Sequence, residues 1–400
     1  MEYLVKFTDS KIENIILNIC ILLFGINFLY KCNYIVMGTF VLLLLFKRFK
    51  ISFGNLVTLI TLLLFSISWF IFSDGHEIAG VCLPLCYLIG CNIDEKDENG
   101  VIKFILLVTT SLAIYTTLFF INNAITNGIT NYDITNQINI WNGQPLWPTN
   151  LMLYSSLFYG CFGYIVFGKV NKYVRLFYLI IFVVNAYYAM MLSRRAALLM
   201  IALSFSIAFA FKFFFDKEIN RKKLIKTSMM ICIIGLICFM LLFATYKLNL
   251  FGFKEIVKQT DLYIRFIGSG RISSFFSDMG RSYYRKEFMQ YFFDYPWGGS
   301  NIREIVGNYS HDLWLDVYDV AGIISMILII VSSILLIVKA ISVLKNKTIS
   351  VDYKMLVISL FICVLAQCCL EPIMEACRAY MFGVCMIHGS LEVIQKGKNV

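Results

Sequence analysis

The chain of 400 residues is dominated by apolar side chains, because 59% of its residues are apolar and only 15% are charged. Soluble domains carry about 25% charged residues on average, so this composition excludes an ordinary soluble protein. The formal net charge is +10, which raises the question of a nucleic-acid partner. No basic stripe alternates with stacking aromatic residues as a nucleic-acid groove requires, so we expect no such partner.

Apolar stretches of helix length recur along the whole chain, which predicts an all-α polytopic membrane protein with about 12 transmembrane helices. Nine helices are expected within residues 1–246 and three within 316–400, separated by one long extracytoplasmic loop at 247–315 that carries short amphipathic helices. The individual spans are predicted near residues 12–30, 33–46, 52–73, 77–91, 101–121, 149–168, 174–192, 196–215, 227–246, 316–338, 351–370 and 378–395.

The distribution of Lys and Arg sets the expected orientation, because short cytoplasmic loops of membrane proteins carry an excess of both. With the N-terminus inside, most Lys and Arg residues fall on the cytoplasmic side, including the clusters Lys47–Lys50 and Arg221–Lys226. We therefore expect both termini in the cytoplasm and the segment 247–315 on the opposite, extracytoplasmic side.

One stretch of the long loop, Arg281–Tyr295, has helical periodicity and ends before Pro296 and a pair of glycines. Arg281 and Arg285 lie along the edge of its apolar face. This pattern is typical of a helix at the membrane surface, with its guanidinium groups at headgroup level, and a plain interfacial anchor explains it equally well. The aromatic residues of that face are Tyr284, Phe288, Tyr291 and Tyr295.

The sequence LSRRAALL at residues 192–199 places Arg194 and Arg195 at an outer helix end, against the positive-inside bias. Neighbouring helical residues point about 100° apart, so the two arginines are expected to have different roles. A guanidinium group stays charged and binds phosphate through two hydrogen bonds, which favours an anion site. Snorkelling of both side chains into the outer headgroups is the structural alternative.

Further charged residues gather on the same side of the predicted membrane. A carboxylate at this depth is costly unless it is paired or faces water, so either a salt bridge to Arg378 or a direct role explains Glu371. The residues expected to contact a substrate here are Arg195, Arg265, Arg271, Arg285, Asp312, Glu371 and Arg378.

His311 is one of only three histidines, and it ends the long loop just before Asp312, Asp316 and Asp319. An imidazole with an ordinary pKa near neutrality suits a group that accepts a proton from a hydroxyl. A local structural role beside Ser310, which resembles a helix cap, is the alternative. No second His or Cys at ligand spacing lies nearby, so we expect no metal.

These motifs occur in an order that resembles the O-antigen polymerases (Wzy type) and the related O-antigen ligases. The order is SRRA at a junction between two helices, a long outer loop with arginines before DYPWGG, SHDLWLDVYDVAG at the start of a span, and EP near the last span. The resemblance implies functional roles for Arg194 or Arg195, for Arg281 with Arg271 as second choice, and for His311. Relatives often have His-Asn, whereas this chain has His311-Asp312.

The resemblance implies a fold like that of the GT-C glycosyltransferases and a location in the bacterial cytoplasmic membrane. It implies inverting, metal-independent transfer between glycans carried on undecaprenyl diphosphate, with no cofactor. His311 would act as the base, and Arg194 with Arg281 would hold the diphosphate. Membrane lipids, a chain-length regulator and a flippase of the same pathway are the expected partners. The alternatives are ligation of the glycan to another acceptor, and a flippase or transporter of lipid-linked oligosaccharide.

Overall fold

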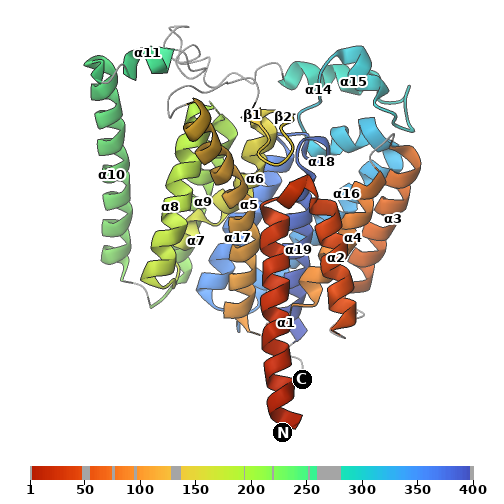
Figure 1. The fold of residues 1–400 in the computed structure, drawn as a ribbon, viewed down its shortest axis with the longest axis horizontal. Helices are drawn as coiled ribbons and strands as arrows, with labels where there is room; N and C mark the ends of the chain where they lie inside the picture. The colour runs from red at the N-terminus through yellow and green to blue at the C-terminus, as the bar shows by residue number, and fades with distance from the viewer. Residues whose placement is uncertain are drawn as a thin grey trace.

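The computed structural model describes residues 2–46, 55–73, 77–93, 97–127, 137–192, 194–218, 220–250, 253–258 and 281–396. Most of these residues are helical, and two short strands, β1 (Gln137–Ile138) and β2 (Pro145–Leu146), form an antiparallel pair (Figure 1). The helices are α1 (Glu2–Gly25), the 3-10 helix η1 (Phe28–Tyr30), α2 (Cys32–Leu45), α3 (Leu56–Phe72), α4 (Glu77–Cys91), α5 (Glu98–Asn127), α6 (Pro148–Gly160), α7 (Phe162–Phe167), α8 (Lys172–Met191), α9 (Arg195–Phe215), α10 (Arg221–Lys247), α11 (Phe253–Lys258), α14 (Arg281–Gln290), α15 (Asn301–Val306), α16 (Leu313–Lys345), α17 (Val351–Cys368), α18 (Ile373–Ala376) and α19 (Arg378–Lys396).

The prediction of a helical membrane protein is confirmed at this level. Among the described residues, six helical stretches are long and apolar enough to cross a membrane: α5, α6 together with α7, α8, α9, α16 and α17. Four shorter apolar helices lie within α1 to α4. Several boundaries differ from the prediction, since α1 begins at Glu2 rather than near residue 12 and α16 extends to Lys345.

The stretch predicted as one span at 149–168 is two helices, α6 and α7, separated at Cys161. Ser204 of α9 restores the hydrogen bonding at the break: its hydroxyl donates to the Gly160 carbonyl at 2.8 Å and accepts the Gly163 N–H at 3.0 Å. A side chain on Gly163 would collide with Ala208 and with the Ser204 backbone. A neighbouring serine therefore satisfies the interrupted helix, as membrane helices require.

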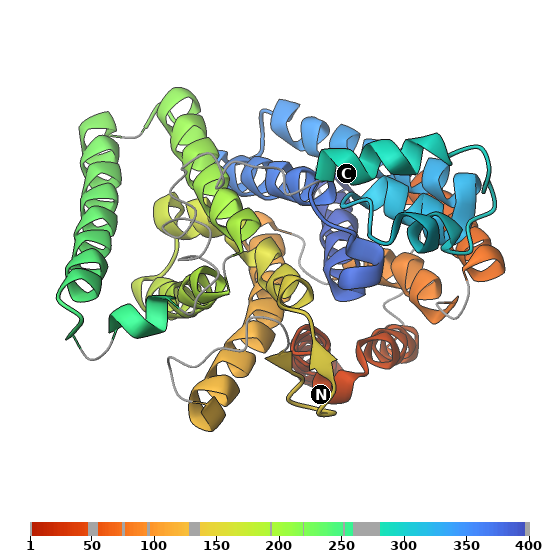
Figure 2. The same ribbon diagram turned by 90° about the horizontal axis from the view of Figure 1, so that it is seen from above.

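The helices α4 and α19 cross at a pair of glycines. A Cβ atom on Gly90 would lie 1.9 Å from the Met386 carbonyl oxygen, and one on Gly389 would lie 2.1 Å from that of Tyr87. Small residues let helix backbones approach closely, which is how membrane helices gain packing energy where lipid offers no hydrophobic drive. Helix α19 is thereby fixed in the interior, while α10 stands at the edge of the bundle (Figures 1 and 2).

The two ends of the bundle differ in what they carry. Both termini lie at one end, and the opposite end carries β1 and β2 together with α11, α14, α15 and α18 (Figure 1). The start of α9, the start of α16 and the turn between α17 and α18 also lie at this second end (Figure 1). The fold therefore brings together three chain segments that carry the arginine, histidine and carboxylate residues singled out in the sequence.

Candidate functional site

The helix α14 forms one wall of the candidate site. It spans Arg281–Gln290, so it ends before the predicted end at Tyr295, and the residues that precede Arg281 lie outside those that the structure describes. Its Phe288 is 1% exposed and packs against Ile302 of α15 and Tyr318 of α16. The aromatic face of this helix therefore packs on the protein itself, and its position at the membrane surface stays a prediction.

A tight backbone crossing holds α14 and α15 against α16. The turn 296–300 follows α14, and α16 is interrupted opposite it at Gly322, where φ is 76°. Three hydrogen bonds join the two backbones: Gly299 N–H to Val320 O at 3.1 Å, Ser300 N–H to Asp319 O at 2.8 Å, and Ile323 N–H to Pro296 O at 2.9 Å. The turn thus supplies partners to helix groups that the interruption exposes.

Glycine is required on both sides of this crossing. A Cβ atom on Gly298 would lie 2.6 Å from the Gly322 nitrogen, and one on Gly322 would lie 2.6 Å from the Pro296 oxygen. The first glycine of the motif DYPWGG, Gly298, is therefore explained by the close approach of the turn backbone to the backbone of α16. The sequence prediction treated 316–338 as an uninterrupted span and missed the break.

His311 lies at the start of α16, in the left-handed backbone region with φ of 59°. Asp312 caps the helix, because its carboxylate accepts the Leu315 N–H at 2.8 Å. Ser310, which resembled the cap in the sequence, instead donates to the Asp312 carbonyl at 3.3 Å. The His311 ring lies 6.2 Å from the Tyr284 ring, and its buried Nδ1 has no hydrogen-bond partner in the described parts of the chain.

Arg285 holds the His311 backbone in this position. Its guanidinium donates to the His311 carbonyl at 2.7 Å and to the carbonyl of Cys369, at the end of α17. Its Nε also lies 3.3 Å from a carboxylate oxygen of Asp312. Arg285 and Asp312 were both predicted to contact substrate, and here they contact each other. Their geometry fits positioning of His311 better than direct binding.

Arg281 and Glu371 form a second ion pair beside the first. The guanidinium of Arg281 lies 3.0 Å from a Glu371 carboxylate oxygen, and Glu371 is only 5% exposed. Burial raises the pKa of Glu371, whereas Arg281 and Arg194 act in the opposite direction. Arg194 thus acts electrostatically on this carboxylate, and its guanidinium donates to the Thr149 hydroxyl at 2.7 Å.

The electrostatics of His311 differ from the expectation of a pKa near neutrality. Burial lowers the pKa of His311 to about 4, and the positive charges of Arg281 and Arg285 contribute to the shift. The imidazole is consequently neutral at pH 7 and has a nitrogen lone pair available. A bound anion that neutralises the two arginines would raise this pKa and make the ring a stronger base.

The remaining predicted residues are less central. Arg195 is the first residue of α9 and is half-buried. Arg378 donates from Nε to the Met374 carbonyl at 3.3 Å and acts electrostatically on Tyr30 and Cys32, which places it toward the turn between α1 and α2. Arg265, Arg271 and His76 lie outside the described residues.

A third ion pair, which the sequence analysis missed, joins Arg303 of α15 to Glu375 of α18. Arg303 also lies over the Tyr309 ring, 5.1 Å from its centroid. Asp319 accepts the N–H groups of Ile302 and Arg303 at 3.1 and 3.2 Å. The sequence did contain a signal for this buried polar group. Asp312, Asp316 and Asp319 have the spacing that puts side chains on one face of a helix, and all three are buried here.

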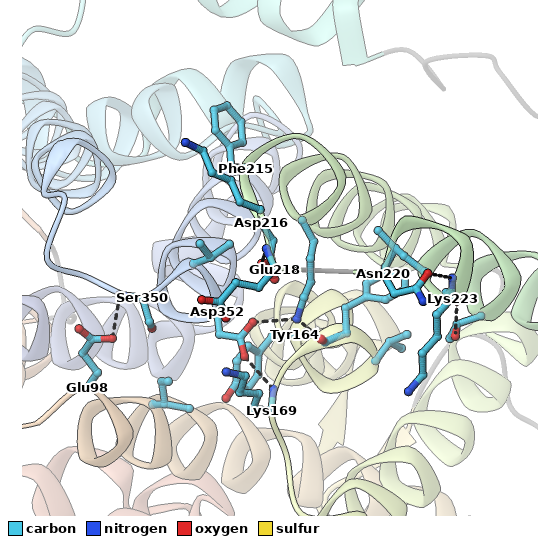
Figure 3. A pocket seen from close by; sticks show the side chains of 18 of the residues that line it. Glu98, Tyr164, Lys169, Phe215, Asp216, Glu218, Asn220, Lys223, Ser350 and Asp352 are labelled. Atoms are coloured by element: carbon cyan, nitrogen blue, oxygen red, sulfur yellow. Dashed lines mark hydrogen bonds and ion pairs between the residues drawn. The ribbon is translucent and has the colours of Figure 1, made fainter.

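A separate cavity of about 1380 Å³ lies at the other end of the bundle, near the termini, and is shown in Figure 3. On its wall, Lys212 of α9 pairs with Asp352 of α17 at 2.8 Å and donates to the Phe167 carbonyl at 2.5 Å. Asp352 also accepts the Lys169 N–H at 3.0 Å. These contacts join three helix ends, and the cavity is remote from His311.

The described residues contain no group of three or more His, Cys, Asp or Glu side chains arranged to hold a metal ion. The chain matches no protein-family model, and no curated protein matches it. The support for a function therefore comes from the gathered site residues and from the motifs that resemble the O-antigen polymerases.

Proposed function

We propose that the chain is a glycosyltransferase that polymerises oligosaccharide repeat units carried on undecaprenyl diphosphate, at the outer face of a bacterial cytoplasmic membrane. One observation carries the proposal: segments far apart in the sequence meet at one end of the bundle, where Arg281 pairs with Glu371 and Arg285 of the same helix holds the backbone of His311. Arg194 acts electrostatically on Glu371 in the same group. Its products are O-antigen, capsular or exopolysaccharide chains.

The reaction follows from the chemistry of these residues. A hydroxyl of the acceptor glycan attacks the anomeric carbon of the donor, and the bond from that carbon to the diphosphate oxygen breaks. The diphosphate leaves with the electron pair, and the hydroxyl proton passes to His311. Arg194 and Arg281 stabilise the negative charge that develops on the departing diphosphate. A single displacement of this kind inverts the anomeric configuration.

The proposal takes a topology of twelve spans with cytoplasmic termini. The six long apolar stretches and the four shorter ones would supply ten crossings, and α10 and α19 would supply the other two. An even number of crossings puts both termini on one side, in keeping with their position at one end of the bundle (Figure 1). Most Lys and Arg side chains then face the cytoplasm.

A ligase and a flippase remain the alternative functions, and one experiment separates all three. We expect deletion of the gene in its host to remove the ladder of long chains and to leave acceptors that carry a single repeat unit. Loss of a ligase would instead leave complete polymer attached to the lipid carrier. Loss of a flippase would leave repeat units on the cytoplasmic side. The readouts are gel analysis of surface polysaccharide and extraction of lipid-linked intermediates.

A further inference from the structure

The carboxylate of Glu371 lies where an anionic ligand of the arginines would be expected. It is buried, it accepts a hydrogen bond from Arg281 at 3.0 Å, and Arg194 lies close enough to act on its charge. Carboxylates and phosphates are alternative partners for the same guanidinium fork. The two arginines assigned to the diphosphate are therefore already close to an anion that belongs to the chain.

The neighbouring Arg285 does not share this arrangement. Arg285 donates to two backbone carbonyls as well as pairing with Asp312, so it is fixed by acceptors that cannot be exchanged. In the part of the chain that the structure describes, Arg281 pairs with one side chain, Glu371, which lies in the turn between α17 and α18 rather than inside a helix. Arg281 is consequently the guanidinium whose partner can be replaced without disturbing a helix.

Building on the proposed function, we infer that Glu371 is an internal competitor of the substrate's diphosphate group. Glu371 pairs with Arg281 while the site is empty, and the diphosphate displaces it on binding. After the transfer, the returning carboxylate competes with the released lipid diphosphate and speeds its departure. The buried carboxylate thus limits the affinity of the site for both donor and product.

Inorganic pyrophosphate is a direct probe of this exchange, because it contains the diphosphate without lipid or sugar. Binding is measured by titration calorimetry on the purified full-length protein. We expect Glu371→Gln to bind pyrophosphate about tenfold more tightly than the wild type, since the competing charge is gone. Arg281→Gln should bind it more weakly. Glu375→Gln is the matched control, because Glu375 loses the same charge but pairs with Arg303.

Unchanged or weaker binding by Glu371→Gln would show that Glu371 positions Arg281 rather than competing, and this overturns the inference. An equal gain in Glu375→Gln also overturns it, because a general change in net charge then explains the effect. Absence of pyrophosphate binding in both the wild type and Glu371→Gln overturns it as well.

The binding measurement is independent of polymer synthesis, so a protein that exchanges pyrophosphate for Glu371 but makes no polymer would overturn only the proposed function.

Discussion

His311 combines an unusual backbone with a ring that is neutral at pH 7. A φ of 59° is uncommon for a residue with a side chain, and such conformations persist where the surroundings enforce them. Here Arg285 holds the carbonyl and Asp312 caps the helix that follows. The same arginine helps to lower the pKa of the ring. Positioning and electrostatics at this residue therefore share one cause.

We expect His311→Asn to leave a folded, inserted protein that makes almost no polymer. Asparagine tolerates the left-handed backbone, so the substitution removes the base without adding strain. Loss of general-base catalysis lowers rates by about 10²–10⁴-fold. The measurement is the length distribution of the surface polysaccharide at matched expression. Polymer of normal length would remove His311 from the mechanism.

The ring of His311 should titrate near pH 4 in the ligand-free protein. Because the folded-state pKa is lowered, the neutral form is stable above that value, and protonation begins only as the pH falls toward it. Nuclear magnetic resonance of labelled histidine can follow this, with the His311→Asn protein identifying the signal. Pyrophosphate should raise the midpoint. A midpoint near 6.5 without ligand would contradict the burial and the two nearby charges.

Arg194→Lys should reduce polymer synthesis nearly as much as Arg194→Ala. Lysine keeps the charge but lacks the planar fork that binds a diphosphate through two hydrogen bonds. Arg195→Lys is the control. The side chain of Arg195 points in a different direction from that of Arg194, so we expect a smaller loss of polymer synthesis. Full activity of Arg194→Lys, measured by the same gel analysis, would favour simple charge attraction or snorkelling.

At the scale of the elements, α16 shows why the sequence prediction was incomplete. Its apolar run correctly predicted a long apolar helix, but a glycine within such a run does not reveal whether the helix continues. The interruption at Gly322 depends on the turn 296–300, which supplies hydrogen-bond partners from a distant part of the loop. The same holds for α6 and α7, where Ser204 of another helix satisfies the break.

Gly322→Ala should destabilise the protein by at least about 1–3 kcal/mol, the strain of a residue held in a backbone region that only glycine adopts readily. Contact with Pro296 adds to this cost. The measurement is thermal unfolding of the purified protein. Gly38→Ala is the control, because Gly38 lies inside α2 with open space around it and alanine favours a helix. Equal stability of the two variants would contradict the close backbone contact described between Gly322 and the turn 296–300.

At the scale of the whole molecule, the sequence predicted the helices well and the contacts poorly. Apolar length locates the long apolar helices, and a helix was correctly expected within residues 281–295. Charge alone did not identify partners, since Glu371 pairs with Arg281 and Glu375 pairs with Arg303. Ion pairs between distant segments depend on packing that no local pattern encodes.

We expect Cys369 to react with a membrane-impermeant maleimide in intact spheroplasts. The turn between α17 and α18 lies at the end opposite both termini, and the cysteine is exposed (Figure 1). A cysteine placed at Thr348, in the turn between α16 and α17, should react only after permeabilisation when Cys369 is replaced by serine. Labelling of Thr348→Cys in intact spheroplasts would reverse the proposed orientation and the mechanism with it.

The crossing of the turn 296–300 with α16 also limits how the site can open. Separating the two backbones would leave several amide and carbonyl groups without partners close to the membrane, where water is scarce. The outer segment from Pro296 onward therefore behaves as part of the membrane helix and not as a hinged cover. Motion that admits a glycan is therefore expected at the other end of α14, where the ion pair between Arg281 and Glu371 is exchangeable. Arg285, one turn further along, stays held by the carbonyls of His311 and Cys369.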